Sequence, residues 1–284
     1  MTTPISNTFS FSRLLMVMKR DFVENWKSYF NSFLSLYAAF LISALMAFVT
    51  IGDRVDAQVY FAYRLGFFIA IGLITYFIFH ITAGNIMSVL QTKEKRISYL
   101  MLPATQAEKF VGRALQAIIG TSIMVIVALF LAEITRLLLF PLLGAPEPLQ
   151  QFCLFDLNDI FLKGAFWNGV ENIEDKTLMY LAIFNTCCCI IATHAMFILG
   201  GTYFYKRPVL KTFSWIVLGA AVLSFIAGYA GTNPYRAQVD ETTVLTTSCI
   251  LYLVIAAICW GLSYFLFTRS QVTERINFKF LKRG

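Results

Sequence analysis

The chain has 284 residues, of which 58% are hydrophobic and only 14% are charged, and its formal net charge is +7. A soluble domain has about 25% charged residues, so this composition excludes an ordinary soluble globular protein. The positive charge gathers between apolar runs, which fits contact with lipid headgroups and not with nucleic acid.

Residues 1–28 are predicted to be a cytoplasmic amphipathic segment. From residue 11 onward, apolar side chains recur at three- and four-residue spacing on one face of a helix, with Arg13, Arg20 and Lys27 on the other. Such a helix can lie in the membrane interface ahead of the first span. It can also be an extension of the first span that packs on other protein.

Six apolar runs follow, each about as long as the roughly 20 residues that a helix needs to cross the hydrocarbon core. Their approximate bounds are Tyr29–Ile51, Phe67–Leu90, Ala114–Leu143, Leu178–Tyr203, Thr212–Ala230 and Leu245–Phe267. The predicted fold is therefore all-α and polytopic, with one transmembrane domain over residues 1–284. Within it, residues 29–267 form a six-span bundle and residues 268–284 a cytoplasmic tail.

The distribution of positive charge predicts the topology. Of the 23 Lys and Arg residues, 17 lie in the segments that share a side with the N-terminus, and only five lie in the segments on the other side. Positively charged loops stay in the cytoplasm, and an even number of spans returns the chain to the side where it began. Both termini are therefore expected in the cytoplasm.

The loop between the second and third runs has a specified shape. It contains a basic stretch and then Pro103, which disfavours helical geometry at the residue before it. Thr105 and Glu108 are spaced as a capping box, in which each side chain bonds to the other residue's backbone amide. The expected order is a short helix, a proline break and a new helix that begins at Thr105 and runs through Arg113 into the third span.

Ionisable side chains within apolar runs are costly and need a reason. Glu133 and Arg136, at i,i+3 spacing, can form an ion pair on one face of the third run. The pair can pack the bundle near the outer interface, or it can be a polar spot that faces a substrate. A third reading is that the span ends earlier.

The second and fourth runs carry further polar side chains, His80, Asn85 and His194. Interhelical hydrogen bonds are the favoured reading for the two histidines, with metal or proton handling as the alternative. The six cysteines show no metal-binding or disulfide pattern, and Cys153 is the one clearly outside the runs. No P-loop or other catalytic motif is present, so neither a cofactor nor enzymatic activity is expected.

The segment Tyr99–Phe110 resembles the permease subunits of ABC-2 type ABC exporters. Many of these carry a Leu-Pro-small-Ser/Thr-x-x-Glu pattern just before the third span, which matches Leu102, Pro103, Ala104, Thr105 and Glu108 here. The amphipathic N-terminal segment and the six spans are similar as well. In such exporters the largest external loop often lies between the fifth and sixth spans, whereas here it follows the third, so the resemblance does not extend to the substrate.

The resemblance implies a membrane permease without its own ATPase, located in the bacterial cytoplasmic (inner) membrane. A separate ATPase subunit would dock on a coupling helix at Glu94–Leu102, and a second permease copy or a sister subunit would complete the pathway. The residues that the resemblance assigns to ATPase coupling are Ile97, Tyr99, Leu100, Leu102, Pro103, Thr105 and Glu108.

The apolar residues Tyr99, Leu100, Leu102 and Pro103 are expected to be exposed, because lipid does not cover this loop and exposed apolar side chains mark a protein contact. Lys93, Lys95 and Arg96 would suit an acidic rim on the partner. Two other classes of function stay open. One is a membrane-embedded enzyme that uses Glu133, His80 or His194. The other is a membrane scaffold or sensor unrelated to ABC transporters.

Overall fold

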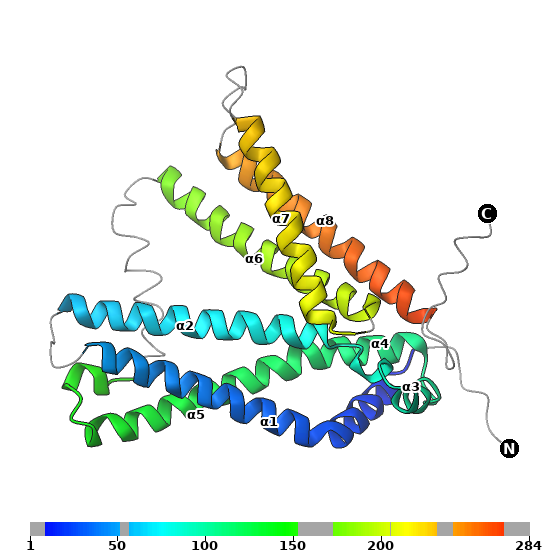
Figure 1. Cartoon of the computed structure of the whole chain (residues 1–284), viewed down its shortest axis with the longest axis horizontal. Coiled ribbons are helices and arrows are strands. Elements are labelled where there is room, and N and C mark those ends of the chain that lie inside the picture. Colours follow the sequence, from blue (N-terminus) through cyan, green and yellow to red (C-terminus); the bar gives the residue numbers. More distant parts are fainter. Residues whose placement is uncertain (1–8, 52–56, 153–172, 205, 232–240, 270–284) are drawn as a thin grey trace. The chain divides into compact units, whose positions relative to one another are not determined.

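The computed structural model describes residues 9–51, 57–152, 173–204, 206–231 and 241–269, and the described residues form helices and no strands (Figure 1). The elements are α1 (Phe11–Ile51), α2 (Ala57–Gly84), η1 (Ser88–Leu90), α3 (Lys93–Leu100), α4 (Gln106–Leu115), η2 (Gln116–Gly120), α5 (Thr121–Leu142), η3 (Glu147–Gln150), α6 (Ile173–Tyr203), α7 (Pro208–Gly231) and α8 (Glu241–Thr268). The predicted all-α class is confirmed. Cys153 and the predicted tail beyond residue 269 lie outside the described residues.

Six helical stretches are long and apolar enough to cross a membrane. In the most apolar 18 residues of each stretch, no more than 33% of the residues are buried within the chain. Large apolar side chains such as Val49 and Phe225 therefore face outward. A water-soluble monomer exposes only a few hundred Å² of contiguous apolar surface. Lipid must therefore cover these helices, and the chain is a multi-pass membrane protein.

The amphipathic N-terminal segment is the first part of α1 and not a separate helix. α1 continues without a break for 41 residues. At 1.5 Å per residue this is about 60 Å, roughly twice the thickness of the hydrocarbon core. Of the two readings, the structure favours an extension of the first span.

The end of the second helix differs from the sequence prediction. The second apolar run was expected to stay helical to Leu90, but α2 ends at Gly84 and the short η1 helix follows. At this end the backbone changes to i,i+3 hydrogen bonds, from the Ile86 amide to the Ala83 carbonyl oxygen and from the Ser88 amide to the Asn85 carbonyl oxygen, which is a common way to tighten a helix terminus. The helix predicted to begin at Thr105 and to continue into the third span is confirmed, because α4 passes through the π-helical turn η2 into α5 and one helical stretch extends over Gln106–Leu142.

The chain divides into two compact units. Of the described residues, the first unit combines those within 9–18, 79–117 and 173–269, and the second unit combines those within 19–78 and 118–152. The first unit packs α6 along α8, where the Thr202 and Ser263 hydroxyls hydrogen bond at 2.6 Å. The second unit buries Phe140 of α5 against Phe48 of α1 and Tyr63 and Phe67 of α2.

Close approach of α6 to the end of α2, both within the first unit, depends on glycine. A Cβ atom added to Gly201 would lie 2.5 Å from the carbonyl oxygen of Gly84, and one added to Gly200 would overlap the Thr212 side chain. Small residues let helix backbones approach closely in membranes, where packing holds helices together. A larger side chain at Gly201 would have to move the backbone at the end of α2, and one at Gly200 would have to displace the Thr212 side chain.

Replacing Gly201 with Ala should therefore lower the thermal stability of the detergent-solubilised protein. Overpacking of this kind costs about 1–3 kcal/mol. Gly219→Ala is the matched control, because a Cβ atom there meets no atom within 4 Å. It should be neutral or slightly stabilising, since Ala is the better helix former. Equal melting temperatures for the two variants would contradict the close approach.

Candidate functional site

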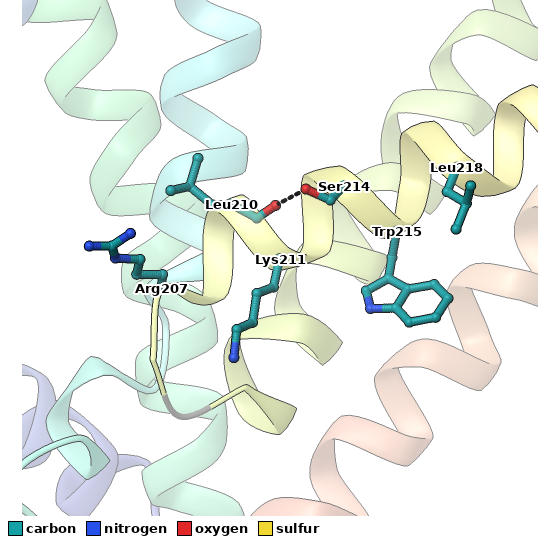
Figure 2. A pocket seen from close by; sticks show the side chains of 6 residues that line it. All are labelled: Arg207, Leu210, Lys211, Ser214, Trp215 and Leu218. Atoms are coloured by element: carbon teal, nitrogen blue, oxygen red, sulfur yellow. Dashed lines mark hydrogen bonds between the residues drawn. The ribbon is translucent and has the colours of Figure 1, made fainter.

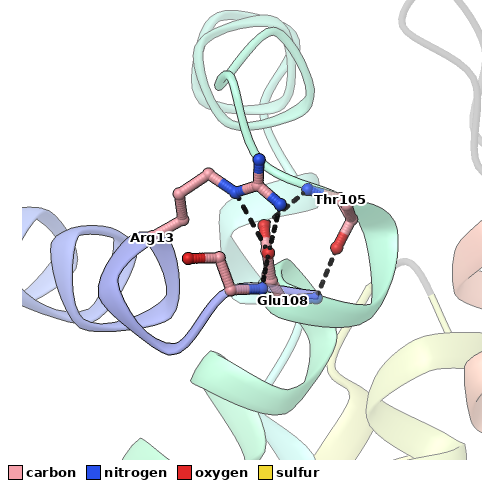
Figure 3. A network of polar contacts seen from close by, with 4 residues as sticks. Arg13, Thr105 and Glu108 are labelled. Atoms are coloured by element: carbon pink, nitrogen blue, oxygen red, sulfur yellow. Dashed lines mark hydrogen bonds and ion pairs between the residues drawn. The ribbon is translucent and has the colours of Figure 1, made fainter. Parts of the chain in front are cut away.

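The capping box predicted at Thr105 and Glu108 is present at the start of α4. Thr105 has extended backbone angles, its hydroxyl accepts from the Glu108 amide at 3.2 Å, and its own amide donates to Glu108 Oε2 at 2.8 Å. Figure 3 shows both bonds. This arrangement satisfies two amides that the first turn of a helix otherwise leaves unpaired.

The second oxygen of Glu108 holds the beginning of α1, which the sequence did not predict. Oε1 accepts from the Ser10 amide at 2.6 Å and from Nε and Nη2 of Arg13 at 3.1 and 2.9 Å (Figure 3). The Glu108 side chain is fully buried, whereas 22% of the Arg13 side chain is exposed. A buried carboxylate with four charge-assisted hydrogen bonds is a strong anchor. It ties the N-terminal helix to the loop that precedes the third span.

Further contacts fix α3 against α4. The Tyr99 hydroxyl donates to the Lys109 carbonyl oxygen at 2.7 Å, and Lys109 Nζ donates to the Leu100 carbonyl oxygen at 2.7 Å. Arg113 on α4 donates from Nε to the Ile86 carbonyl oxygen at 2.9 Å, next to η1. Because these bonds join side chains to backbone, they hold the loop in one shape.

The expectation that Tyr99, Leu100 and Leu102 are exposed is wrong in part. Tyr99 is only 5% exposed and belongs to the apolar core of the first unit, and Leu100 and Leu102 pack against that core. Arg96, expected on a basic rim, is buried as well. One face of the short helix α3 must cover the apolar core beneath it, and the sequence alone does not identify which face is buried.

The outward surface of this loop is formed by other members of the predicted set and by one residue that was missed. Pro103 is exposed, Ile97 is 37% exposed, and Met101, absent from the prediction, is 71% exposed. Lys93 and Lys95 are exposed beside them. We call these five residues the α3 surface. The spacing of Ile97 and Met101, four residues apart on one helix face, is the signal that could have identified Met101.

The two histidines come together in the first unit. His80 on α2 is buried, and its Nε2 lies 2.9 Å from the Thr193 hydroxyl on α6. The His80 and His194 rings meet edge to face, with centroids 6.1 Å apart. The predicted interhelical hydrogen bond is confirmed for His80. Asn85 does not join them, because it follows the end of α2 and is exposed.

Glu133 and Arg136 form the predicted ion pair in the second unit, and both side chains are fully buried. Arg136 Nε and Nη2 donate to the two Glu133 oxygens at 2.8 and 2.7 Å. The guanidinium also donates to the Leu149 and Gln151 carbonyl oxygens at 2.5 and 2.6 Å. It therefore holds the residues that follow α5 against the helix end, which favours the structural reading of the pair.

The described residues contain no group of three or more His, Cys, Asp or Glu side chains that could hold a metal ion. The five described cysteines are free thiols. Comparison of the chain with protein-family models, with curated proteins and with solved structures finds no match. The polar network around Glu108, with the α3 surface beside it, is the best-defined candidate site.

Proposed function

We propose that this chain is the membrane-spanning permease subunit of an ABC exporter of the ABC-2 type. In this proposal a separate ATPase subunit docks on the α3 surface, and a second copy of the chain or a sister subunit completes the translocation pathway. The chain itself carries out no covalent chemistry. It resides in the bacterial cytoplasmic membrane with both termini inside, as the charge asymmetry of its loops predicts.

The observation that carries the proposal is a loop that is rigid beneath and apolar outside. Glu108, Tyr99 and Lys109 hold its backbone through buried hydrogen bonds. Ile97 and Met101 nevertheless point away from that core. An exposed apolar pair on a fixed support, flanked by lysines, is suited to contact a protein with an acidic rim.

The same network gives the loop a mechanical connection to the spans. α4 continues through η2 into α5, so a force on the loop acts directly on the third span. Glu108 also connects the loop to α1, whose helix continues into the first span. Closure of a docked ATPase would thus shift two spans together, which is how a two-state transporter is driven between its inward and outward forms.

Replacing Ile97 and Met101 together with Asp should release a co-purifying ATPase from the tagged chain isolated from native membranes. Loss of two central contacts should reduce the amount recovered at least about tenfold. Membrane insertion should be unchanged, because no span is altered. The measurement is the ATPase recovered per chain, by quantitative mass spectrometry of the purified complex.

The matched control replaces Ile97 and Met101 with Leu, which keeps both exposed positions apolar and alters no span. This variant should retain the ATPase. Wild-type recovery in the Ile97 and Met101 variant would contradict the docking surface. The absence of any ATPase from the wild-type preparation would contradict the proposal that the chain is a subunit of an ABC exporter.

A further inference from the structure

A groove lies along the exposed face of the first turns of α7, in the first unit. It is shallow and open to the surface, has a volume of about 320 Å³ and is lined by Arg207, Leu210, Lys211, Ser214, Trp215 and Leu218 (Figure 2). The five positions from Leu210 to Leu218 recur at three- and four-residue spacing, which places them on one face of α7, and Arg207 directly precedes the helix. The face has a cationic end formed by Arg207 and Lys211 and an apolar end formed by Trp215 and Leu218.

The two cations are available to a ligand. Among the described residues, no carboxylate pairs with Arg207 or Lys211. The Lys211 ammonium lies 5.5 Å from the centroid of the Phe204 ring, which orients it. Arg207 has a φ angle of 51°, a left-handed backbone conformation that residues other than glycine seldom adopt. Strained positions of this kind are concentrated where a side chain has a task.

The groove begins where α7 enters the membrane. The apolar span extends over Pro208–Phe225, so Arg207 and Lys211 lie at its first turn, at the level of the headgroups. Trp215 lies four residues beyond Lys211, about 6 Å deeper, and is 64% exposed. The Leu210 and Leu218 side chains are exposed as well. The order of charge and apolar surface along the groove is the order of phosphate and acyl chain in a phospholipid.

We propose that this groove binds one anionic phospholipid. The lipid phosphate lies between Arg207 and Lys211, and one acyl chain follows Leu210, Trp215 and Leu218. Basic pockets at the membrane surface recognise anionic headgroups in this way. The proposal does not depend on the exporter assignment, because it needs only that α7 crosses the membrane.

The test uses the full chain reconstituted in nanodiscs of phosphatidylcholine in which about one lipid in five is phosphatidylglycerol. Native mass spectrometry after mild detergent release counts the phosphatidylglycerol molecules retained per chain. Wild type should retain one. Each basic side chain near an anionic surface contributes about a fivefold gain in affinity, so Arg207→Gln with Lys211→Gln should weaken retention about thirtyfold.

Lys19→Gln with Lys27→Gln is the matched control, because it removes the same charge from exposed positions on α1. It should retain the lipid as wild type does. Inorganic phosphate added to pure phosphatidylcholine nanodiscs should not raise the melting temperature, whereas phosphatidylglycerol should raise it in wild type and not in the Arg207 and Lys211 variant. Equal losses in both double variants, unchanged retention in the first, or protection by phosphate alone would each overturn the proposal.

Discussion

Replacing Arg136 with Met should be the most destabilising single change among the polar residues described above. It leaves the Glu133 carboxylate buried without its partner and removes the donors from the Leu149 and Gln151 carbonyl oxygens. Breaking a buried ion pair from one side costs about 3–5 kcal/mol, because an uncompensated charge stays out of water. We expect a loss of that order in thermal unfolding of the detergent-solubilised protein.

A double-mutant cycle separates the pair from the loop contacts. Glu133→Gln alone should also destabilise, since it leaves the Arg136 charge without a countercharge, and it should keep the bonds to the loop carbonyl oxygens. Arg136→Met combined with Glu133→Gln should be more stable than Arg136→Met alone, because no buried charge remains. Glu147→Gln, which removes an exposed acid from η3, should change stability by less than about 0.5 kcal/mol. If the two single effects simply add in the double variant, the pair is not coupled and its structural role is refuted.

Replacing Glu108 with Gln should detach the beginning of α1 from α4. The substitution keeps the shape of the side chain but removes the charge of the carboxylate. The new amide NH₂ group can only donate, so it faces backbone or guanidinium N–H groups that are donors as well. Hydrogen bonds to a charged group contribute about 1.5–3 kcal/mol each, so the loss should reach about 3 kcal/mol. The Ser10 amide and Arg13 are the groups that lose their acceptor.

The local consequence of Glu108→Gln is measurable by trypsin. Release of the first turns of α1 should expose the bond after Arg13 and speed its cleavage at least about tenfold, since cleavage follows the population of the opened form. Arg20→Gln is the matched control, because Arg20 forms an exposed i,i+4 pair with Glu24 that contributes little. It should leave both stability and cleavage at Arg13 unchanged. Cleavage of the Glu108 variant at the wild-type rate would show that this carboxylate does not anchor α1.

Several features of the fold follow from the sequence alone, because they depend on residues close together in the chain. The length and apolarity of six runs predict six spanning helices, since only a helix satisfies its own backbone within lipid. The Thr105–Glu108 capping box and the Glu133–Arg136 pair are also local, because three residues along a helix bring two side chains onto one face.

Other features were decided by tertiary packing. Glu108 meets Arg13, which lies 95 positions earlier in the chain, and Arg136 reaches carbonyl oxygens that any residue type could present. Tyr99 faces inward while Ile97 and Met101 face outward, and the choice between these faces depends on what lies beneath α3. Sequence periodicity reports which residues share a face, but the partner of a side chain depends on where distant helices pass. That position is set by packing, so only the folded chain supplies it.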